Sequence, residues 1–309
     1  MKIAVLFSGQ GQQAAAMGTE LYQQESTYRQ VVDQVNQTLS WDLTRSADWI
    51  DDPTRVPVAI TAMSLASYRL LGTTAAKPVV LTGLSLGEYG ALMAANVMAV
   101  RDGIKVVADR ARYMQRAGLQ RPGQMVAALK VTPDIVQAAC AAAQTVGVAY
   151  PANYNLADQV VIGGDVAGVR AASDYLHAQG VKRVVPLDVA VASHTPLMRT
   201  ASEALAKRLG FVNVRGPQVP VISNTTVAPF SATEVKTTLV QQLIQPTHFA
   251  ACLQRIATYD LDAIVQVGPG NNLAKFAKKT VPTVPVYTMT TAADWQTFLT
   301  ALKAENSVG

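Results

Sequence analysis

The pattern Gly-x-Ser-x-Gly, formed by Gly83, Ser85 and Gly87, places the strongest constraint on the fold of this chain. An apolar run of strand type, Val79 to Leu81, precedes it, and a helix-prone stretch begins at Leu86. A serine at a sharp turn between a strand and a helix needs glycine on both sides, because the chain passes so close that a Cβ would collide. The sequence therefore predicts a nucleophile elbow, with the side chain of Ser85 clear of the sheet edge.

The same turn can stabilise developing negative charge. It aims the backbone N–H of Leu86 and the positive end of the following helix at an oxyanion formed on an attacked carbonyl. A second donor is available in the loop after the predicted first strand, Lys2 to Phe7, where Gly9-Gln10-Gly11 exposes the N–H of Gln10. Ligands of open α/β sheets bind at this end of the strands. The alternative for both segments is an ordinary glycine-rich turn.

Composition excludes several classes of protein. The 309 residues are 50% hydrophobic and 15% charged, which is typical of a globular protein with a large core. No apolar run reaches the roughly 18 residues of a membrane span, and we expect a cytosolic protein without membrane contact. The formal net charge of +5 favours an anionic partner or substrate, but the basic residues are dispersed and carry no nucleic-acid motif. Cys140 and Cys252 have no metal-like spacing and are expected to be buried thiols.

Few side chains can assist the serine. The chain has three histidines, His177, His194 and His248, and His194 lies immediately before a predicted helix start, where a base on a loop would lie. A carboxylate usually orients such a histidine, and Asp188 lies six residues earlier. Asp188 also follows a predicted strand, where its alternative role is to help end that element. Arg110 lies beside the apolar face of a predicted helix over 100–116 and is either a solvated charge or a fork for a carboxylate.

The order of the predicted elements indicates two domains. Residues 124–188 read as strand, helix, strand, strand, helix, strand, which is the ferredoxin-like arrangement of a small α+β domain. We expect its elements at 125–129, 133–144, 146–154, 159–163, 166–179 and 183–187. Residues 1–123 and 189–309 are expected to form the larger, α/β-hydrolase-like catalytic domain with a parallel sheet, into which the small domain is inserted. Its remaining expected helices lie over 17–39 and 57–71, with another after Met198 that ends at about Leu209. Its remaining expected strands lie over 219–224, 263–267 and 284–289.

The chain resembles the malonyl-CoA:acyl carrier protein transacylases of fatty-acid synthesis, relatives of the acyltransferase domains of polyketide synthases. Seven blocks in order along nearly the whole chain carry the resemblance. They are F-S-G-Q-G-Q-Q near the start, G-L-S-L-G-E-Y-G-A-L at the elbow, D-R-A-R-Y-M-Q at 109–115, N-Y-N-L-A-D-Q-V-V-I-G-G at 153–164, S-H-T-P-L-M at 193–198, Q-Q-L-I-Q-P at 241–246 and V-G-P-G at 267–270.

The resemblance implies a role for each matched residue. Ser85 matches the acylated nucleophile, His194 the general base and Arg110 the residue that holds the malonyl carboxylate. The N–H groups of Gln10 and Leu86 match the oxyanion hole. Two further matches are the main-chain carbonyl of Gln242, which orients the imidazole in place of an acid, and Asn155 near the acyl site.

The resemblance further implies transfer of malonyl from malonyl-CoA to the phosphopantetheine thiol of acyl carrier protein, with no bound cofactor and no metal, by a monomer. Two positions depart from the family pattern. Leu84 replaces a frequent histidine before the nucleophile, and Val56-Pro57 replaces a common Gln-Pro pair. Leu84 removes a polar contact to the carboxylate and leaves more of that task to Arg110. An esterase or a non-catalytic binding module of the same fold are the competing interpretations, and Arg110 discriminates because an esterase has no need of a buried cation.

Overall fold

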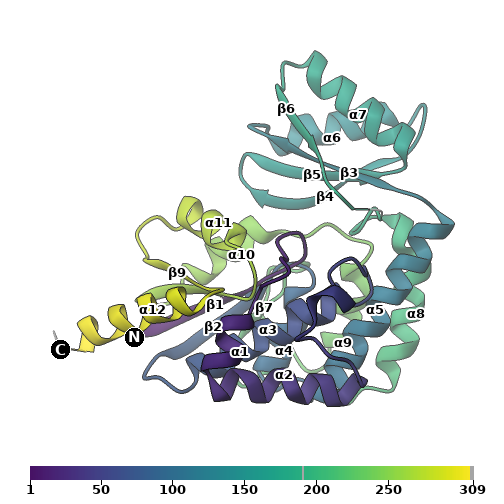
Figure 1. Cartoon of the computed structure of the whole chain (residues 1–309). Helices are drawn as coiled ribbons and strands as arrows, with labels where there is room; N and C mark the ends of the chain where they lie inside the picture. The colour runs from purple at the N-terminus through teal and green to yellow at the C-terminus, as the bar shows by residue number, and fades with distance from the viewer. Residues whose placement is uncertain (190, 307–309) are drawn as a thin grey trace. The chain divides into compact units, whose positions relative to one another are not determined.

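The computed structural model describes residues 1–189 and 191–306, and these form two compact units (Figure 1). The first unit comprises Met1–Ala111, Val212–Val235 and Cys252–Gly309, and the second comprises Arg112–Phe211 and Lys236–Ala251. No helix in these described ranges is long and apolar enough to cross a membrane. The chain is thus an α/β protein whose units are each built on a separate sheet.

The described part of the first unit is built on a five-stranded sheet in the order β7-β2-β1-β8-β9. All neighbouring strands pair in parallel. The strands are β1 (Lys2–Phe7), β2 (Lys77–Gly83), β7 (Val221–Ile222), β8 (Ala263–Val267) and β9 (Val286–Met289). The side chains of β8 and of all but the first residue of β1 are buried, as expected of central strands covered on both faces. Parallel pairing brings the carboxyl ends of these strands to one edge.

Helices follow most of these strands. They are α1 (Thr19–Gln24), α2 (Ser26–Leu39), α3 (Val56–Leu71), α4 (Gly87–Ala94), α11 (Asn272–Thr280) and α12 (Ala292–Asn306), with a short 3₁₀ turn η1 (Ser46–Asp48). The single helix expected over 17–39 is wrong in detail, because Glu25 adopts extended backbone angles and separates α1 from α2. Helix α3 is buried along almost its whole length, so its composition of Ala, Met and Leu reflects packing on every side.

The described part of the second unit contains an antiparallel four-stranded sheet in the order β4-β5-β3-β6. Its elements are β3 (Gln124–Leu129), α6 (Pro133–Ala143), β4 (Ala149–Leu156), β5 (Gln159–Gly164), α7 (Val166–Ala178) and β6 (Arg183–Pro186). Helices α6 and α7 pack on one face of this sheet, where Val136, Leu176 and Ile162 share a buried core (Figure 1). The predicted order of elements over 124–188 is therefore present.

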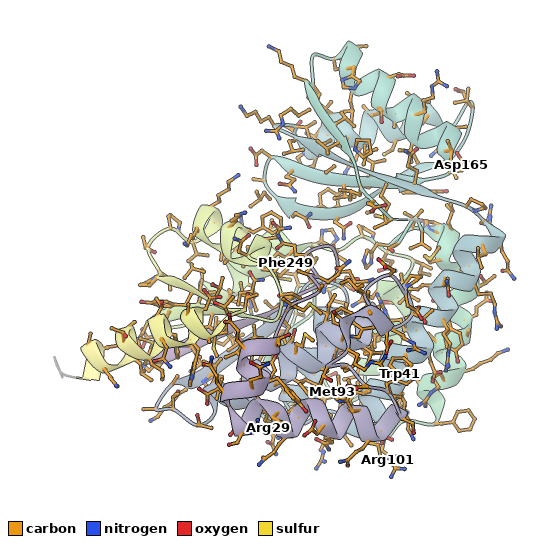
Figure 2. All side chains as sticks on the ribbon, viewed as in Figure 1. Arg29, Trp41, Met93, Arg101, Asp165 and Phe249 are labelled. Carbon is orange, nitrogen blue, oxygen red and sulfur yellow. The ribbon has the colours of Figure 1, made fainter. Side chains whose placement is uncertain are left out.

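Asp165 explains why β4 begins later than expected, at Ala149 instead of residue 146. Asp165, labelled in Figure 2, lies immediately before α7. Its carboxylate caps α7 by accepting from Gly168 N (2.7 Å) and also accepts from Val148 N (3.1 Å). A Cβ on Gly147 would collide with this carboxylate and with Gly168. The chain at 147–148 is therefore held against the start of α7 before it can enter the sheet.

The second unit is larger than the expected small domain, and the boundaries expected at 124 and 188 fall inside it. It also contains η2 (Pro196–Met198) and α8 (Arg199–Gly210), the end of α5 (Val100–Gln120), most of α9 (Val235–Gln242) and the start of α10 (Phe249–Ile256). Ser202 Oγ donates to Val240 O (2.9 Å) and so joins α8 to α9. Thr247 pairs with β4 through Thr247 N to Ala152 O (2.9 Å) and Tyr154 N to Thr247 O (2.8 Å). These long-range bonds could not be read from local sequence patterns.

Candidate active site

Ser85 lies at the turn between β2 and α4 with a φ of 53°. A non-glycine residue in this left-handed region stores on the order of 1–3 kcal/mol of strain, and such strain is common at functional sites. A Cβ on Gly83 would collide with the backbone of Gly87, and a Cβ on Gly87 would collide with the carbonyl group of Phe7. The turn thus has the two close approaches that the spacing of the glycines predicts.

Two buried hydrogen bonds from Asn224, just beyond the neighbouring strand β7, hold the elbow in place. Asn224, just beyond β7, donates from Nδ2 to Gly83 O (2.6 Å), and its own N–H donates to Glu88 Oε1 (2.5 Å). Glu88 and Asn224 are both completely buried. Because Gly83 and Glu88 flank Ser85, this one asparagine fixes the chain on both sides of the serine.

Arg110 contacts the serine directly. Its Nη2 donates to Ser85 Oγ over 3.1 Å, and the residue is 1% exposed. The guanidinium lies over the ring of Tyr89 at 5.3 Å from the centroid, and burial raises the pKa of Tyr89 to about 12. A guanidinium stacked on a neutral phenol keeps its charge and its fork of N–H groups. The site therefore places a fixed positive charge beside the hydroxyl.

The loop that follows β1 packs against the elbow. Leu84 N donates to Phe7 O (3.4 Å), and a Cβ on Gly9 would lie 2.8 Å from Leu84 O. Gln10, the next residue, is exposed, whereas Leu86 is buried immediately before α4. The two N–H groups predicted to form an oxyanion hole thus come from loops that follow adjacent parallel strands, β1 and β2.

His194 and Gln242 meet within the second unit. His194 is 3% exposed and has a φ of 62°, and its Nδ1–H donates to the carbonyl oxygen of Gln242 over 2.6 Å. A carbonyl oxygen can only accept, so this bond assigns the ring proton to Nδ1 and leaves Nε2 as the basic nitrogen. Gln242 is the last residue of α9, where a backbone carbonyl has no partner within the helix and the helix dipole is negative.

The other candidates have structural roles or are exposed. His177 Nδ1 bonds with Val181 O (2.9 Å), and His248 stacks on Tyr154 at 5.1 Å between ring centroids. Asp188 is exposed at the end of the small sheet. The carbonyl of Gln242 therefore occupies the position at Nδ1 that a carboxylate would need. Both cysteines, Cys140 in α6 and Cys252 in α10, are buried free thiols, as predicted.

Asn155 belongs to β4 in the second unit and is 7% exposed. Its Oδ1 has no hydrogen-bond partner among the described residues. A buried acceptor without a donor costs on the order of 1–3 kcal/mol, so such groups call for a specific explanation. A donor that arrives with a substrate would supply one.

Sequence reasoning assigned no role to Glu88, Tyr89 or Asn224. Glu88 and Tyr89 lie in the block that carries the resemblance, and a signal was present, because Glu88 is the only charged residue in the apolar stretch of α4. Asn224 gave no signal. Asn224 lies 141 residues from Gly83 along the chain. It reaches the elbow only because β7 pairs with β2.

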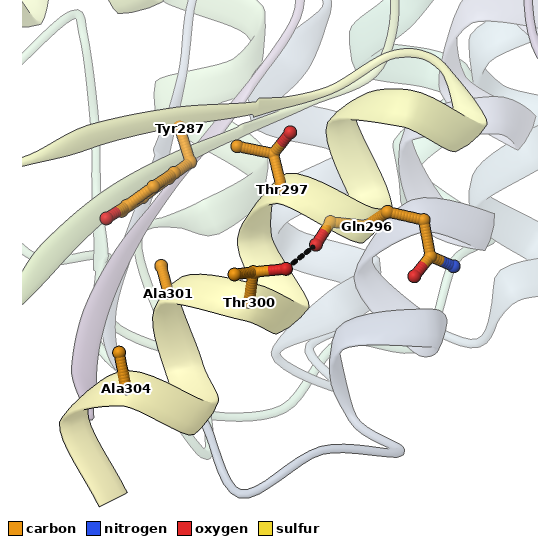
Figure 3. A pocket seen from close by; sticks show the side chains of 6 residues that line it. All are labelled: Tyr287, Gln296, Thr297, Thr300, Ala301 and Ala304. Carbon is orange, nitrogen blue, oxygen red and sulfur yellow. Dashed lines mark hydrogen bonds between the residues drawn. The ribbon is translucent and has the colours of Figure 1, made fainter. Parts of the chain in front are cut away.

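A surface groove of about 480 Å³ lies elsewhere, between β9 and α12 (Figure 3). Its lining residues are Tyr287, Gln296, Thr297, Thr300, Ala301 and Ala304. Thr300 Oγ1 donates to Gln296 O (2.9 Å), a bond internal to the helix. Among these six side chains there is no carboxylate, imidazole, thiol or cation, so the groove offers no ionisable group except the phenol of Tyr287.

Sequence similarity to known proteins extends over most of the chain. Residues 5–305 match the family described as the acyl transferase domain. The chain is 33% identical over 288 residues to a malonyl CoA-acyl carrier protein transacylase of Haemophilus influenzae, covering 91% of this chain and 92% of the relative. It is 30% identical over 285 residues to the protein of the same description from Bacillus subtilis, covering 90% of each.

Solved structures agree with this assignment. An acyl carrier protein S-malonyltransferase from Vibrio cholerae superposes with a TM-score of 0.91 at 31% identity, covering 96% of this chain and 100% of that one. A malonyl-transacylase in complex with a type II PKS acyl-carrier protein gives a TM-score of 0.91 at 30% identity, with 98% and 100% coverage. The chain belongs to the acyl transferase family that includes the malonyl CoA-acyl carrier protein transacylases.

Proposed function

We propose that this protein transfers a malonyl group from malonyl-CoA to the phosphopantetheine thiol of an acyl carrier protein, through a malonyl ester on Ser85, for fatty-acid synthesis. The single observation that carries the proposal is the buried hydrogen bond from Arg110 to Ser85 Oγ. An enzyme that only hydrolyses neutral esters gains nothing from a desolvated cation at its nucleophile. A malonyl group carries a free carboxylate one methylene away from the carbonyl that the serine attacks.

The energetic argument favours an acidic acyl group. An isolated carboxylate moved from water into a protein interior costs several kcal/mol, and a guanidinium can offset this cost through two charge-assisted hydrogen bonds. Acetyl has no carboxylate and would leave the Arg110 charge without that compensation. Leu84, which stands where relatives often have histidine, adds no polar group, so Arg110 carries most of the recognition.

The reaction runs in two half-reactions. Ser85 Oγ attacks the thioester carbonyl while His194 Nε2 takes the hydroxyl proton, and the N–H groups of Gln10 and Leu86 donate to the resulting oxyanion. The intermediate collapses, the bond from carbon to sulfur breaks, and the CoA sulfur leaves with the proton from His194. The thiol of the carrier protein then attacks the ester, gives its proton to His194, and releases Ser85 with the proton returned.

The position of Gln242 supports His194 as the base. When Nε2 accepts a proton the ring becomes an imidazolium, and the carbonyl at the end of α9 stabilises that charge in buried surroundings.

The proposed acceptor of the malonyl group is an acyl carrier protein. The malonyl-transacylase of the solved complex binds an acyl-carrier protein, and the structural match to that enzyme covers 98% of this chain. The orphaned Oδ1 of Asn155 suits a donor such as an amide N–H of a pantetheine arm. No metal and no bound cofactor take part in this mechanism, and we propose that the protein acts as a monomer in the cytoplasm.

The topology of the two sheets supports the finer assignment of the fold. The parallel sheet with Ser85 at a turn of positive φ is what an α/β-hydrolase-like domain requires. The order β4-β5-β3-β6, with α6 and α7, supports a ferredoxin-like arrangement for the sheet of the second unit.

Intact-mass measurement tests the proposal. The protein is incubated separately with malonyl-CoA, methylmalonyl-CoA and acetyl-CoA without a carrier protein, and the adduct is located by peptide mapping. We expect one malonyl group on Ser85 and far less acetyl. Equal labelling by malonyl and acetyl, or rapid hydrolysis of both with no stable adduct, would favour an esterase and contradict the proposal.

A further inference from the structure

Residues 266–272, which include the V-G-P-G turn after β8, have no role in the mechanism above. They nevertheless hold both ends of the loop that carries Gln10. This oxyanion loop, defined as Ser8 to Gln12, is joined to residues 266–272 by side-chain bonds at Ser8 and at Gln12. The sequence separation of these contacts is 258 to 260 residues. The free N–H donor proposed at Gln10 therefore lies midway between two anchoring points.

Gln266 makes the first anchor. It is 1% exposed at the end of β8, and its Nε2 donates to Ser8 Oγ (2.9 Å) and to Gly270 O (3.0 Å). Its Oε1 accepts from Ala274 N (2.8 Å) in α11. Ser8 in turn donates from both its N (3.1 Å) and its Oγ (2.9 Å) to Val267 O. One buried amide thus links the start of the loop, the V-G-P-G turn and the first turn of α11.

Gln12 makes the second anchor. Its Oε1 accepts from Asn271 N (2.9 Å) and Asn272 N (2.7 Å). Asn271 is the residue before α11, and its own side chain makes no capping bond, so Gln12 caps the helix from a distant loop. Gly270 has a φ of 77°, and a Cβ there would collide with Gln12. The turn is therefore shaped to receive this side chain.

We propose that Gln12, with Gln266, is a positioning residue that holds the N–H of Gln10 in line with the oxyanion formed at Ser85. This inference rests on the oxyanion role of Gln10 in the proposed function and adds the residues that set its geometry. An oxyanion donor works because it is oriented before the reaction, and a misplacement of about 1 Å can cost on the order of a hundredfold in rate. Between the anchors, Gly11 has a φ of 104°, so the loop is short and sharply bent.

Gln12 suits a clean test because it is only half-buried and contributes an acceptor. Gln12→Met keeps the length of the side chain and removes the acceptor, whereas Gln12→Glu keeps an acceptor that the helix N-terminus favours. Gln24→Met, at an exposed position of α1, is the matched control. Acylation of Ser85 is followed by rapid quench and intact mass over a range of malonyl-CoA concentrations.

We expect Gln12→Met to lower the maximal acylation rate by about 10- to 100-fold with an unchanged half-saturating concentration, because the contact that it misplaces, from Gln10 N–H to the oxyanion, forms only in the transition state. Gln12→Glu and Gln24→Met should acylate like the wild type. Gln266→Met should show the same loss of maximal rate. A Gln12→Met enzyme with wild-type rate, a rise in the half-saturating concentration alone, or no rescue by Gln12→Glu would overturn the proposal.

A fluorophosphonate probe separates this inference from the proposed function. Ser85 displaces fluoride from the probe at phosphorus, and the developing anionic oxygen uses the same N–H groups whatever the natural acyl donor is. If the wild type reacts with the probe but not with malonyl-CoA, the proposed function fails, and the positioning role is then decided by whether Gln12→Met reacts more slowly than Gln12→Glu. Equal probe rates for these two variants would contradict it.

Discussion

Arg110 Nη2 donates a hydrogen bond to Ser85 Oγ over 3.1 Å, joining the middle of α5 to the elbow after β2. The two residues are 25 positions apart, and the arginine is buried against the ring of Tyr89. A guanidinium carries five N–H donors in a planar fork, the geometry that matches a carboxylate. The proposed nucleophile and the residue proposed to recognise the acyl group are therefore a single hydrogen-bonded pair.

Arg110→Ala should reverse the choice of acyl group. Loss of the guanidinium leaves the malonyl carboxylate buried without a partner, so kcat/KM for malonyl-CoA should fall by at least about a hundredfold, whereas acetyl transfer is kept or rises. Arg110→Lys should restore only part of the malonyl activity, because an ammonium is a point charge without the planar fork. Steady-state kinetics with both acyl-CoAs measure this. A proportional loss for the two substrates would show that Arg110 only supports the fold.

Ser85→Ala should abolish the malonyl adduct seen by intact mass. His194→Ala should slow formation of the adduct by about 10²- to 10⁴-fold, because a serine hydroxyl is a weak nucleophile without a base. His177→Ala, which removes a histidine of α7 that bonds with Val181 O, is the control and should acylate at the wild-type rate. Labelling of the Ser85→Ala protein would place the nucleophile elsewhere.

Gly87→Ala should destabilise the fold, and Gly210→Ala should not. A Cβ at Gly87 meets the carbonyl of Phe7, whereas a Cβ at Gly210, in α8, meets nothing within 4 Å. We expect a loss of about 1–3 kcal/mol in the free energy of unfolding for Gly87→Ala, since the backbone must shift. Gly210→Ala should leave it unchanged or raise it by up to about 1 kcal/mol, as expected for alanine in a helix. Urea denaturation of both variants distinguishes collision from general intolerance of alanine.

His248 should make stability depend on pH. Partial burial, with stacking on Tyr154, lowers the pKa of His248 from its ordinary value of 6.5. The unfolded chain then binds a proton at a higher pH than the folded chain, so stability is full above pH 6.5 and decreases as the pH falls below it. His248→Phe should flatten that part of the profile. Unfolding midpoints of the two proteins between pH 5 and 8 measure the difference, and parallel profiles would argue against this origin.

Transfer to the carrier protein should weaken with salt more than self-acylation does. Carrier proteins of this pathway are typically acidic, and the net charge of +5 should raise the association rate. The candidate contacts are Lys182, Arg183, Lys275, Lys278 and Lys279, all of which are exposed. Lys278→Glu should slow transfer and reduce its salt dependence, whereas Lys207→Glu, the same charge change at an exposed position of α8, should have less effect. Equal salt sensitivity of both half-reactions would contradict electrostatic steering.

Local sequence determined the elements whose signals are short in range. The apolar run before Ser85 and the glycines at 83 and 87 predicted the turn, because a Cβ at Gly83 collides with Gly87 and Glu88 of the same turn. The alternation of strands and helices over 124–188 predicted the small sheet and its helices. The resemblance named Arg110 and Gln242, whereas spacing alone left Arg110 between a solvated charge and a fork and offered Asp188 as the partner of the histidine.

Tertiary structure decided everything that depends on contacts between distant segments. The pairing of β7 with β2 brings Asn224 to Gly83, the end of α9 brings a carbonyl to His194, and the turn after β8 brings Gln266 and α11 to the loop of Gln10. The extent of the second unit has the same origin, because Thr247 joins β4 through backbone bonds and through a bond from Asn153 Nδ2 to Thr247 Oγ1, across 94 residues of chain. Periodicity reports which face of an element is buried, but a hydrogen bond between segments 48 to 260 residues apart depends on strand order and helix placement, which no local pattern encodes.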